Sequence, residues 1–347
     1  MIVLPHSLTV LTTNSCTADC GHCCMNSSRK RKGRFDLDLF KITLGSFLSF
    51  SDIRVIVFAG GEPTLLGIKT LSNAIDYARN KGLVSRLVTN ASWARTEDHS
   101  RRLLSSLREA GLNEINISFD DYHSPYVPDE CVVNAWKVAR SMDFSAVLIS
   151  NTCSPSSVIS PSYVDMILGE NLPRRFNGEN VSGFQFKKTN DQFIGISNSS
   201  LMYLGRGVAL RGVNARNNTE LSRQVMKHKC PNVLASPAIT PENHLVGCCG
   251  FELNGNPVLD LGESSGIDIV KLWEIASDNI IIKAIREVGP GFLLEFAAQK
   301  NNNIRIRDDY IGVCEVCQDV IASNTVIEVL ISSIDEFAKC LYDRGGR

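Results

Sequence analysis

The 347-residue sequence predicts an α/β protein whose parallel strands curl into a partial (β/α)6 barrel, followed by a small C-terminal domain. Three observations predict this fold. Short β-branched apolar runs alternate with longer segments of helical periodicity, two of the helical segments end at a glycine, and polar motifs follow the strands directly. Such alternation indicates β-α units and a parallel sheet, and repeated right-handed crossovers curl the sheet into a barrel.

The predicted elements follow one another regularly along the first half of the chain. Strands are expected at residues 7–13, 53–59, 84–89, 114–119 and 146–151. Helices are expected at residues 36–50, 66–81 and 96–110. Gly82 and Gly111 follow the second and third helices, as is usual at helix ends.

A polar motif stands at the carboxyl end of each predicted strand. In strand order, these are Cys16, Cys20 and Cys23; Gly60-Gly61-Glu62-Pro63; Thr89-Asn90; Ser118 and Asp120; and Asn151-Thr152. The carboxyl ends of parallel barrel strands meet on one rim, where barrel proteins build their sites. We therefore expect these motifs to surround one site.

The first motif has the spacing C-x3-C-x2-C. Cys16, Cys20 and Cys23 can hold three corners of a [4Fe–4S] cluster, because thiolates are the ligands that iron–sulfur clusters select. The fourth iron would stay open to a small chelating molecule. A structural zinc site with Cys24 or His22 as fourth ligand is the alternative, and buried inert cysteines are another.

The cysteine spacing and the Gly60-Gly61-Glu62-Pro63 motif, which directly follows a predicted strand, resemble the radical S-adenosylmethionine (SAM) superfamily. The resemblance implies that SAM chelates the open iron and that the glycine backbone approaches the cofactor closely. It also implies the SAM-contacting set, which comprises His22, Gly60, Gly61, Glu62, Pro63, Asn90, Ser118, Asp120 and Asn151.

The segment Asp120-Asp121-Tyr122-His123 follows the fourth strand and combines groups capable of acid–base chemistry. The alternative is a capped loop that orders the SAM pocket. No catalytic base is assigned from the sequence.

A second cysteine set lies in the C-terminal third: Cys230, Cys248, Cys314 and Cys317. Four cysteines could bind zinc or an iron–sulfur cluster. The segment before Cys248 resembles the auxiliary-cluster hairpin of SPASM and twitch domains, with Asn243 in place of a glycine. Asn tolerates the left-handed turn conformation.

This second resemblance implies a twitch-like domain with one fully ligated auxiliary [4Fe–4S] cluster that serves electron transfer. Whether Cys248 or Cys249 is the ligand stays open. The motif Gly205-Arg206-Gly207 is similar to the one that ends barrels of this superfamily, so we expect a barrel over residues 1–207 and the second domain over 208–347. Residues 154–204 match the family poorly.

Composition narrows the class of protein. The net charge is −1, so no global field favours nucleic acid or an anionic membrane. There is no long apolar run and no signal-peptide pattern, so we expect a cytoplasmic location, where the 12 cysteines would not form disulfides. The basic residues 29–34 are either a solvated loop or a rim that attracts an acidic substrate.

The resemblance implies a radical SAM oxidoreductase-type enzyme that cleaves SAM to a 5′-deoxyadenosyl radical and abstracts a hydrogen, with a reducing partner such as flavodoxin or ferredoxin. A peptide substrate, modified by crosslinking, oxidation or epimerisation during ribosomal peptide maturation, is the leading hypothesis. The alternative is a sugar or aminocyclitol dehydrogenase or epimerase. A non-catalytic iron–sulfur or zinc module is a third reading, against which Glu62 and the intact three-cysteine spacing argue.

Overall fold

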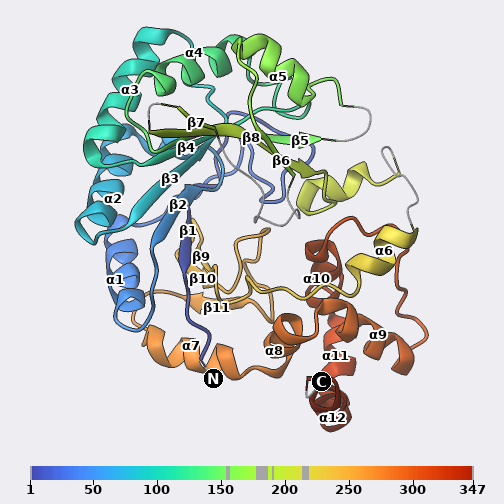
Figure 1. The fold of residues 1–347 in the computed structure, drawn as a ribbon. Helices are drawn as coiled ribbons and strands as arrows, with labels where there is room; N and C mark the ends of the chain where they lie inside the picture. The colour runs from blue at the N-terminus through green and yellow to red at the C-terminus, as the bar shows by residue number, and fades with distance from the viewer. Residues whose placement is uncertain (1, 154–156, 177–186, 190, 213–218, 346–347) are drawn as a thin grey trace.

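The computed structural model describes residues 2–153, 157–176, 187–189, 191–212 and 219–345 (Figure 1). Among these residues, six parallel strands lie side by side: β1 (Ser7–Leu11), β2 (Val55–Ala59), β3 (Val84–Thr89), β4 (Glu114–Ser118), β5 (Ala146–Cys153) and β8 (Gln192–Ser200). The predicted α/β partial barrel is confirmed.

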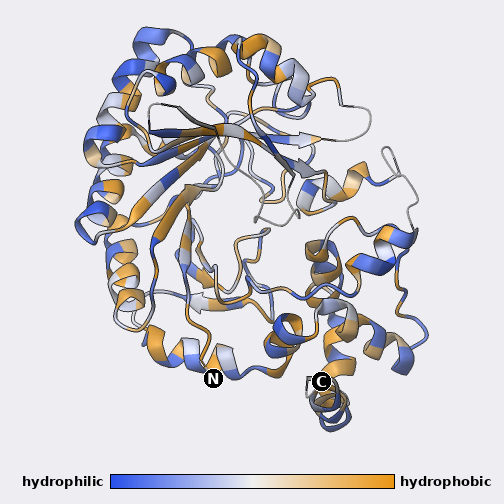
Figure 2. Cartoon of the chain, in the orientation of Figure 1, coloured by the Kyte–Doolittle hydropathy of each residue, from blue (hydrophilic) through white to orange (hydrophobic). Residues whose placement is uncertain are grey.

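Five helices cover the outer face of this sheet (Figure 1): α1 (Leu37–Leu48), α2 (Ile68–Asn80), α3 (Glu97–Ala110), α4 (Asp129–Arg140) and α5 (Pro161–Leu168). Local sequence explains their limits. In α3, the Thr96 side chain caps the first turn by accepting from His99 N, and Gly111 at φ 111° ends the helix. Figure 2 shows these outer helices banded in hydrophobic and hydrophilic colours, as expected for helices with one buried face.

The observed elements depart from the sequence prediction at a few boundaries. The helix expected at 66–81 is a 3₁₀ turn, η1 (Pro63–Leu66), and then α2, because Gly67 at φ 83° breaks the chain direction between them. Strand β5 runs to Cys153, two residues further than expected. The sixth barrel strand, β8, lies within residues 154–204, the segment whose sequence resembles the radical SAM superfamily only poorly.

The C-terminal part of the chain continues the barrel sheet. Strand β9 (Ala238–Ile239) pairs in parallel with β1, and β10 (His244–Val246) and β11 (Asp260–Glu263) follow antiparallel. At the other edge, β6 (Arg174–Phe176) and β7 (Lys187–Thr189) both pair with β8. The division into domains 1–207 and 208–347 stays a prediction.

Helices of the C-terminal part gather below and beside the barrel in Figure 1: α6 (Thr219–Val225), α7 (Ile269–Asp278), α8 (Ile280–Glu287), α9 (Pro290–Lys300), α10 (Val313–Ile321), α11 (Asn324–Ser332) and α12 (Ile334–Gly345). The α7 helix packs on the barrel. Its Trp273 ring lies 5.1 Å from that of Phe47 in α1, and Trp273 Nε1 donates to Val3 O at 2.8 Å.

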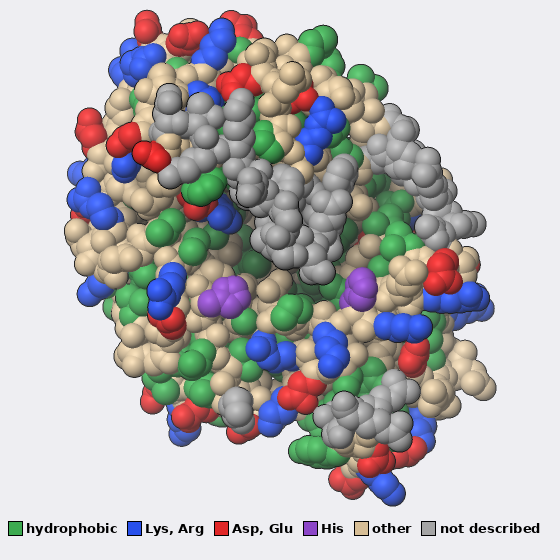
Figure 3. Space-filling model, in the orientation of Figure 1, with side chains coloured by type: hydrophobic (Ala, Val, Ile, Leu, Met, Phe, Trp, Pro, Cys, Tyr) green, Lys and Arg blue, Asp and Glu red, His purple; other side chains and the backbone are tan. Residues whose placement is uncertain are grey.

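No helix in the described ranges combines the length and apolar character that crossing a bilayer requires. On the face drawn in Figure 3, basic and acidic side chains are interspersed, in keeping with the net charge of −1.

Candidate active site

The loop between β1 and α1 (residues 12–36), called the cysteine loop below, places Cys16, Cys20 and Cys23 around one cavity of about 280 Å³. The cavity lies at the carboxyl ends of the barrel strands, since its wall also includes Gly60, Thr89, Ser118 and Thr152. The expected convergence of the polar motifs on one rim is therefore observed for a member of each predicted strand end.

The glycines after β2 allow two loops to touch. Gly61 N donates to Thr13 O at 2.7 Å, and Glu62 N donates to Ser15 O at 2.9 Å. A Cβ atom on Gly61 would lie 2.0 Å from Ser15 O, and Gly60 adopts φ 114°. Only glycine fits at either position, so this turn and the cysteine loop are held together by backbone contact.

The Glu62 carboxylate is fully buried beneath this turn. It accepts from Thr64 Oγ1 at 2.7 Å, Thr89 Oγ1 at 2.9 Å and Asn90 N at 2.9 Å. Burial raises the pKa of Glu62, and these hydrogen bonds oppose that rise. Glu62 does not line the cavity, so the structure gives it an anchoring role, and its contact with SAM stays a prediction. Pro63 is likewise buried, at the start of η1.

Asn90, at the end of β3, does face the cavity. Its amide Nδ2 donates to Cys16 Sγ at 3.5 Å and to Thr17 Oγ1 at 3.0 Å. Thr17 also contacts Ser92 Oγ at 2.7 Å. The turn after β3 therefore orients the first cysteine of the loop.

A 3₁₀ helix, η3 (Gly205–Leu210), also binds the cysteine loop, through hydrogen bonds from Arg206. Arg206 Nε donates to Cys20 O at 3.0 Å, Arg206 Nη2 to Ser27 O at 2.7 Å, and Arg206 N to Cys23 O at 3.1 Å. A Cβ atom on Gly205 would lie 2.6 Å from Cys23 O. The sequence singled out this motif only as the end of the barrel, and its contact with the cysteines is a finding of the structure.

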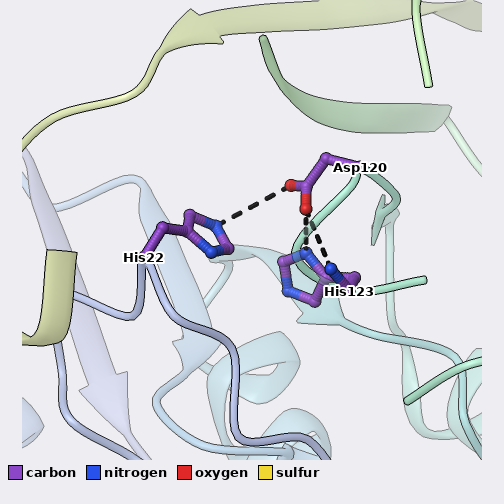
Figure 4. Close-up of side chains that lie close together, drawn as sticks. All are labelled: His22, Asp120 and His123. Atoms are coloured by element: carbon purple, nitrogen blue, oxygen red, sulfur yellow. Dashed lines mark hydrogen bonds and ion pairs between the residues drawn. The ribbon is translucent and has the colours of Figure 1, made fainter. Parts of the chain in front are cut away.

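The loop after β4 brings Asp120 and His123 to the same rim, next to His22 (Figure 4). Asp120 Oδ1 lies 2.9 Å from His123 Nδ1, and Asp120 Oδ2 lies 3.7 Å from His22 Nε2. Burial would raise the pKa of Asp120, but His123 holds it below the usual range.

The two histidines are in different electrostatic states. Burial lowers the pKa of His22 to about 4, which leaves its ring neutral at pH 7. Burial also disfavours a charged His123, but Asp120 and a hydrogen bond with Cys20 outweigh this and raise the pKa of His123 to about 10. His22 lines the cavity, and in the described part of the chain its buried Nδ1 has no hydrogen-bond partner.

The remaining predicted residues either line the cavity or lie buried behind its wall. Ser118 and Thr152 line the cavity. Asn151 is buried behind them, where its Nδ2 donates to Phe119 O at 2.8 Å and to Ile159 O at 3.1 Å. Its contact with SAM stays a prediction.

Sequence reasoning missed part of the wall, namely Ser199, Ser200, Met202 and Leu204. These residues follow or end β8, and small polar residues after an isoleucine-rich run were the available signal. His123 was named only for acid–base chemistry, although it contacts Cys20.

The second cysteine set also converges. Burial raises the pKa of Cys317 well above its usual range, and the neighbouring thiols of Cys248, Cys230 and Cys314 raise it further. The sulfurs of Cys248 and Cys314 flank Gly250, at 3.4 and 3.7 Å from the position of its missing Cβ. Segments far apart in sequence therefore bring four thiols to one place.

Cys249 and Cys24 lie beside this group. The Cys249 thiol hydrogen-bonds the Thr9 side chain of β1. Burial raises the pKa values of Cys248 and Cys314, and the neighbouring Cys249 thiol raises both further. Burial raises the pKa of Cys24 to about 12, with further contributions from Cys23 and Cys314. Cys24 thus stands between the two cysteine sets.

Two backbone features position the second set. Asn243, in the turn between β9 and β10, adopts φ 62°, which confirms the left-handed conformation expected from its place in the sequence. Gly289 approaches the segment before Cys230 so closely that a Cβ atom would lie 2.2 Å from His228 O. Cys230 N in turn donates to Ile285 O at 3.1 Å.

Within the described ranges, His22, Asp120 and His123 form a group of three ligand side chains whose ligand atoms all lie within 4.8 Å of one another.

A parallel barrel with its polar residues at the carboxyl ends of the strands has the architecture of barrel enzymes. Residues 10–147 match the model of the Radical SAM superfamily. In Bacillus subtilis (strain 168), the "Putative peptide biosynthesis protein YydG" is 25% identical over 162 residues, which is 46% of this chain and 50% of that protein. The chain thus matches about half the length of this curated relative.

Similar solved structures include BtrN in complex with AdoMet and 2-DOIA, with a TM-score of 0.48 and 14% identity, covering 85% of this chain and 91% of that chain. Another is Streptococcus suis SuiB bound to the precursor peptide SuiA, with a TM-score of 0.46 and 12% identity, covering 91% of this chain and 76% of that chain.

Proposed function

We propose that this enzyme cleaves SAM reductively and uses the resulting radical to abstract a hydrogen atom from a peptide. The observation that carries the proposal is the meeting of Cys16, Cys20 and Cys23 with the glycine turn after β2 on one cavity of about 280 Å³. Three thiols leave one iron of a [4Fe–4S] cluster without a protein ligand, which is the vacancy that SAM needs.

The proposed cofactors are SAM and two [4Fe–4S] clusters. Cys16, Cys20 and Cys23 would hold the first cluster, and Cys230, Cys248, Cys314 and Cys317 the second. When bound, the first cluster and SAM supply methionine and a 5′-deoxyadenosyl radical, which takes a hydrogen atom from the substrate. The neutral His22 ring, with its unpaired Nδ1 in the cavity wall, fits a polar cofactor there.

The protein's own residues orient and shield this site. Asn90 directs an amide N–H at Cys16 Sγ, and Arg206 fixes the backbone at Cys20 and Cys23. Asp120 positions His123, which hydrogen-bonds Cys20. Each contact holds a thiol in place before a cofactor arrives, which is how preorganised sites lower the cost of binding.

The assignment of a peptide as substrate rests on the curated relative, whose name refers to peptide biosynthesis. Co-expression with short peptides encoded beside the gene, followed by mass spectrometry and chiral amino-acid analysis, tests it. We expect a peptide that loses two hydrogen atoms or gains a D-residue. Turnover of an aminocyclitol or sugar, with every such peptide unchanged, would instead support the small-molecule alternative.

The SAM-cleaving activity is tested by anaerobic reconstitution followed by reduction with dithionite. We expect about eight irons per chain in the wild type and about four when Cys16, Cys20 and Cys23 are all replaced by Ala. 5′-Deoxyadenosine should form with the wild type and be absent with Cys20→Ala. Cys340→Ala, which changes a cysteine outside both sets, is the matched control and should behave as the wild type. Zinc in the C-terminal site, or equal 5′-deoxyadenosine from Cys20→Ala, contradicts the proposal.

The second cluster is proposed to transfer an electron after hydrogen abstraction, because four thiols leave SAM no position to chelate. Cys314→Ser should therefore still form 5′-deoxyadenosine but no longer convert substrate. The variant is compared at equal circular dichroism signal and with its first cluster retained. Substrate conversion at the wild-type rate in that folded variant would make the second cluster structural.

A further inference from the structure

The cysteine loop separates two cavities rather than bounding one. A second cavity of about 690 Å³ lies against Ser15, Cys16 and Thr17. Cys16 lines both this cavity and the one that also contains Cys20 and Cys23. The second cavity has no residue of the glycine turn or of the ends of β4 and β5 in its wall.

The wall of the second cavity carries two arginines. Arg29 Nε donates to Thr17 O at 2.7 Å, and its guanidinium carbon lies 6.0 Å from the centre of the Tyr126 ring. Arg95, from the turn after β3, is exposed on the same wall. Glu130 is the acidic side chain there. The cavity is therefore basic on balance.

The basic character extends beyond the cavity along the chain. Lys30, Lys32 and Arg34 follow Arg29 and are exposed. Arg31 is the member of this run that is paired with an acid, since its Nη2 lies 2.6 Å from Glu252 Oε1. Three exposed cations, Lys30, Lys32 and Arg34, thus follow in sequence the Arg29 that lines the second cavity.

A substrate bound in this second cavity would face the wrong side of the cysteine loop. Hydrogen abstraction would take place in the first cavity, where the glycine turn, Ser118 and Thr152 converge. An electron has no such constraint, because it can pass through Cys16 from one cavity to the other. The second cavity therefore suits delivery of an electron rather than of a substrate.

We propose that the Arg29 and Arg95 side of the second cavity is the docking surface for an acidic one-electron donor protein, which reduces the first cluster through Cys16. This inference rests on the proposed function. In the step, the donor loses one electron and the first cluster gains it, and no other bond forms or breaks. Opposite charges would steer the encounter and raise its rate by roughly 10-fold or more at low salt.

The test compares a charge reversal at the proposed surface with the same reversal elsewhere. Arg95→Glu with Lys30→Glu changes two exposed cations that make no side-chain contact with the cysteine loop among the interactions described. The matched control is Arg101→Glu with Arg102→Glu, on the outer helix α3. Each reconstituted protein is assayed with reduced flavodoxin and, separately, with dithionite. Binding of oxidised flavodoxin is measured by calorimetry.

We expect the double variant to lose roughly tenfold in kcat/KM for flavodoxin and to bind it more weakly, with a difference that shrinks in high salt. Its dithionite-driven 5′-deoxyadenosine formation should equal that of the wild type and the control. Equal flavodoxin binding and rate in both double variants would overturn the docking surface. A double variant that keeps flavodoxin binding but loses substrate conversion would overturn it as well, in favour of a substrate site. Absence of 5′-deoxyadenosine with dithionite in the wild type would instead defeat the proposed function.

Discussion

Gly61 lies so close to Ser15 that one added methyl group would separate the two loops that build the candidate site. The distance from its hypothetical Cβ to Ser15 O is 2.0 Å, and both atoms belong to backbone segments that cannot rotate away. The adjoining hydrogen bonds, from Gly61 N to Thr13 O and from Glu62 N to Ser15 O, depend on the same approach. A glycine can thus determine a site without contributing any functional group.

Gly61→Ala should therefore destabilise the apo-protein by about 1–3 kcal/mol, as overpacking of a tight contact does, and should reduce iron incorporation at the first site. Gly45→Ala is the control, since Gly45 lies within α1 and its Cβ would meet only Tyr77 Oη at 3.9 Å. Replacing a helical glycine should stabilise by about 0.5–1 kcal/mol. Urea unfolding measures the stability of the two variants, and iron analysis measures how much iron each incorporates. Equal iron content in the two variants would contradict the prediction that Gly61 is needed to build the first site.

His123 forms a hydrogen bond with Cys20, and the His123 ring is positioned by Asp120, whose Oδ1 lies 2.9 Å from His123 Nδ1. Hydrogen bonds to the ligating sulfurs are one of the factors that set iron–sulfur potentials, because they stabilise the more negatively charged reduced state. His123→Phe should therefore lower the midpoint potential of the first cluster.

Potentiometric titration followed by electron paramagnetic resonance measures this shift. His99→Phe, at an exposed position of α3, removes an imidazole that makes no contact with the cysteine loop and should leave the potential unchanged. An unchanged potential in His123→Phe would mean that the ring serves only to order the loop after β4.

At the scale of elements, the short helix η3 ties the end of the barrel to its beginning. Arg206 reaches the carbonyls of Cys20 and Ser27 with its guanidinium and that of Cys23 with its backbone. Charge-assisted hydrogen bonds of this kind are each worth about 1.5–3 kcal/mol. The cysteine loop thus has a well-defined shape only when residues nearly two hundred positions later are in place.

Arg206→Met keeps much of the side-chain length but removes the guanidinium donors. We expect iron at the first site to fall while the second site keeps its share, so that the total approaches about four irons per chain. Arg108→Met is the control, because Arg108 pairs with the exposed Asp143 and such pairs contribute about 0–1 kcal/mol. A full complement of iron in Arg206→Met would show that the cysteine loop does not need these hydrogen bonds.

The elements that sequence reasoning found are those with strong local patterns. Strands β2 and β3 are β-branched runs bounded by turns. The α3 helix begins at a Thr96 cap and ends at Gly111, and Gly82 lies in the turn after α2. Strand β8 was missed because its first residues mix Gln192, Phe193 and Gly195 with isoleucines, so no clean alternation appears. The break at Gly67 was missed because a glycine in a helical pattern can also be tolerated within the helix.

Sequence motifs likewise located the site better than they assigned its parts. The cysteines and glycines could be placed because barrel topology brings strand ends together. Tertiary hydrogen bonds between distant segments bury the side chains of Glu62 and Asn151. A bond of the same kind joins Arg206 to Cys20. Those bonds leave no periodic pattern in the chain.

At the scale of the whole molecule, the buried carboxylate of Glu315 in α10 connects the C-terminal helices to the segment that follows the last barrel strand, β8. Glu315, between the two cysteines of α10, is fully buried and accepts from Tyr203 N at 2.7 Å, Ile311 N at 3.1 Å and Arg307 Nη2 at 3.3 Å. Burial raises the pKa of Glu315, and these donors oppose that rise. The second cysteine set is thereby tied to the segment that follows β8.

Glu315→Ala should lower the free energy of unfolding by about 1–3 kcal/mol for each of the two backbone amides, Tyr203 N and Ile311 N, that it leaves without an acceptor. Arg307 keeps its pairs with Asp309 and Asp319. Glu336→Ala removes a carboxylate of the same type from an exposed pair with Lys300 and should cost about 1 kcal/mol or less. Urea unfolding of the two apo-proteins compares them. Similar costs would mean that the Glu315 contacts are replaced by water.

The pairing of β1 with β9 also dictates an order of events during synthesis. Ser7 and Ser236, whose hydroxyls lie 3.1 Å apart, are 229 positions distant in the chain. At about 5–20 residues per second, the ribosome needs roughly 10 to 50 s to supply the second partner after the first. Throughout that interval β1 presents an unpaired, apolar edge of the kind that joins other chains. A nascent chain halted before residue 238 should therefore aggregate or engage chaperones, and slow translation of the middle third should lower the yield of folded protein more than slow translation of the last helices.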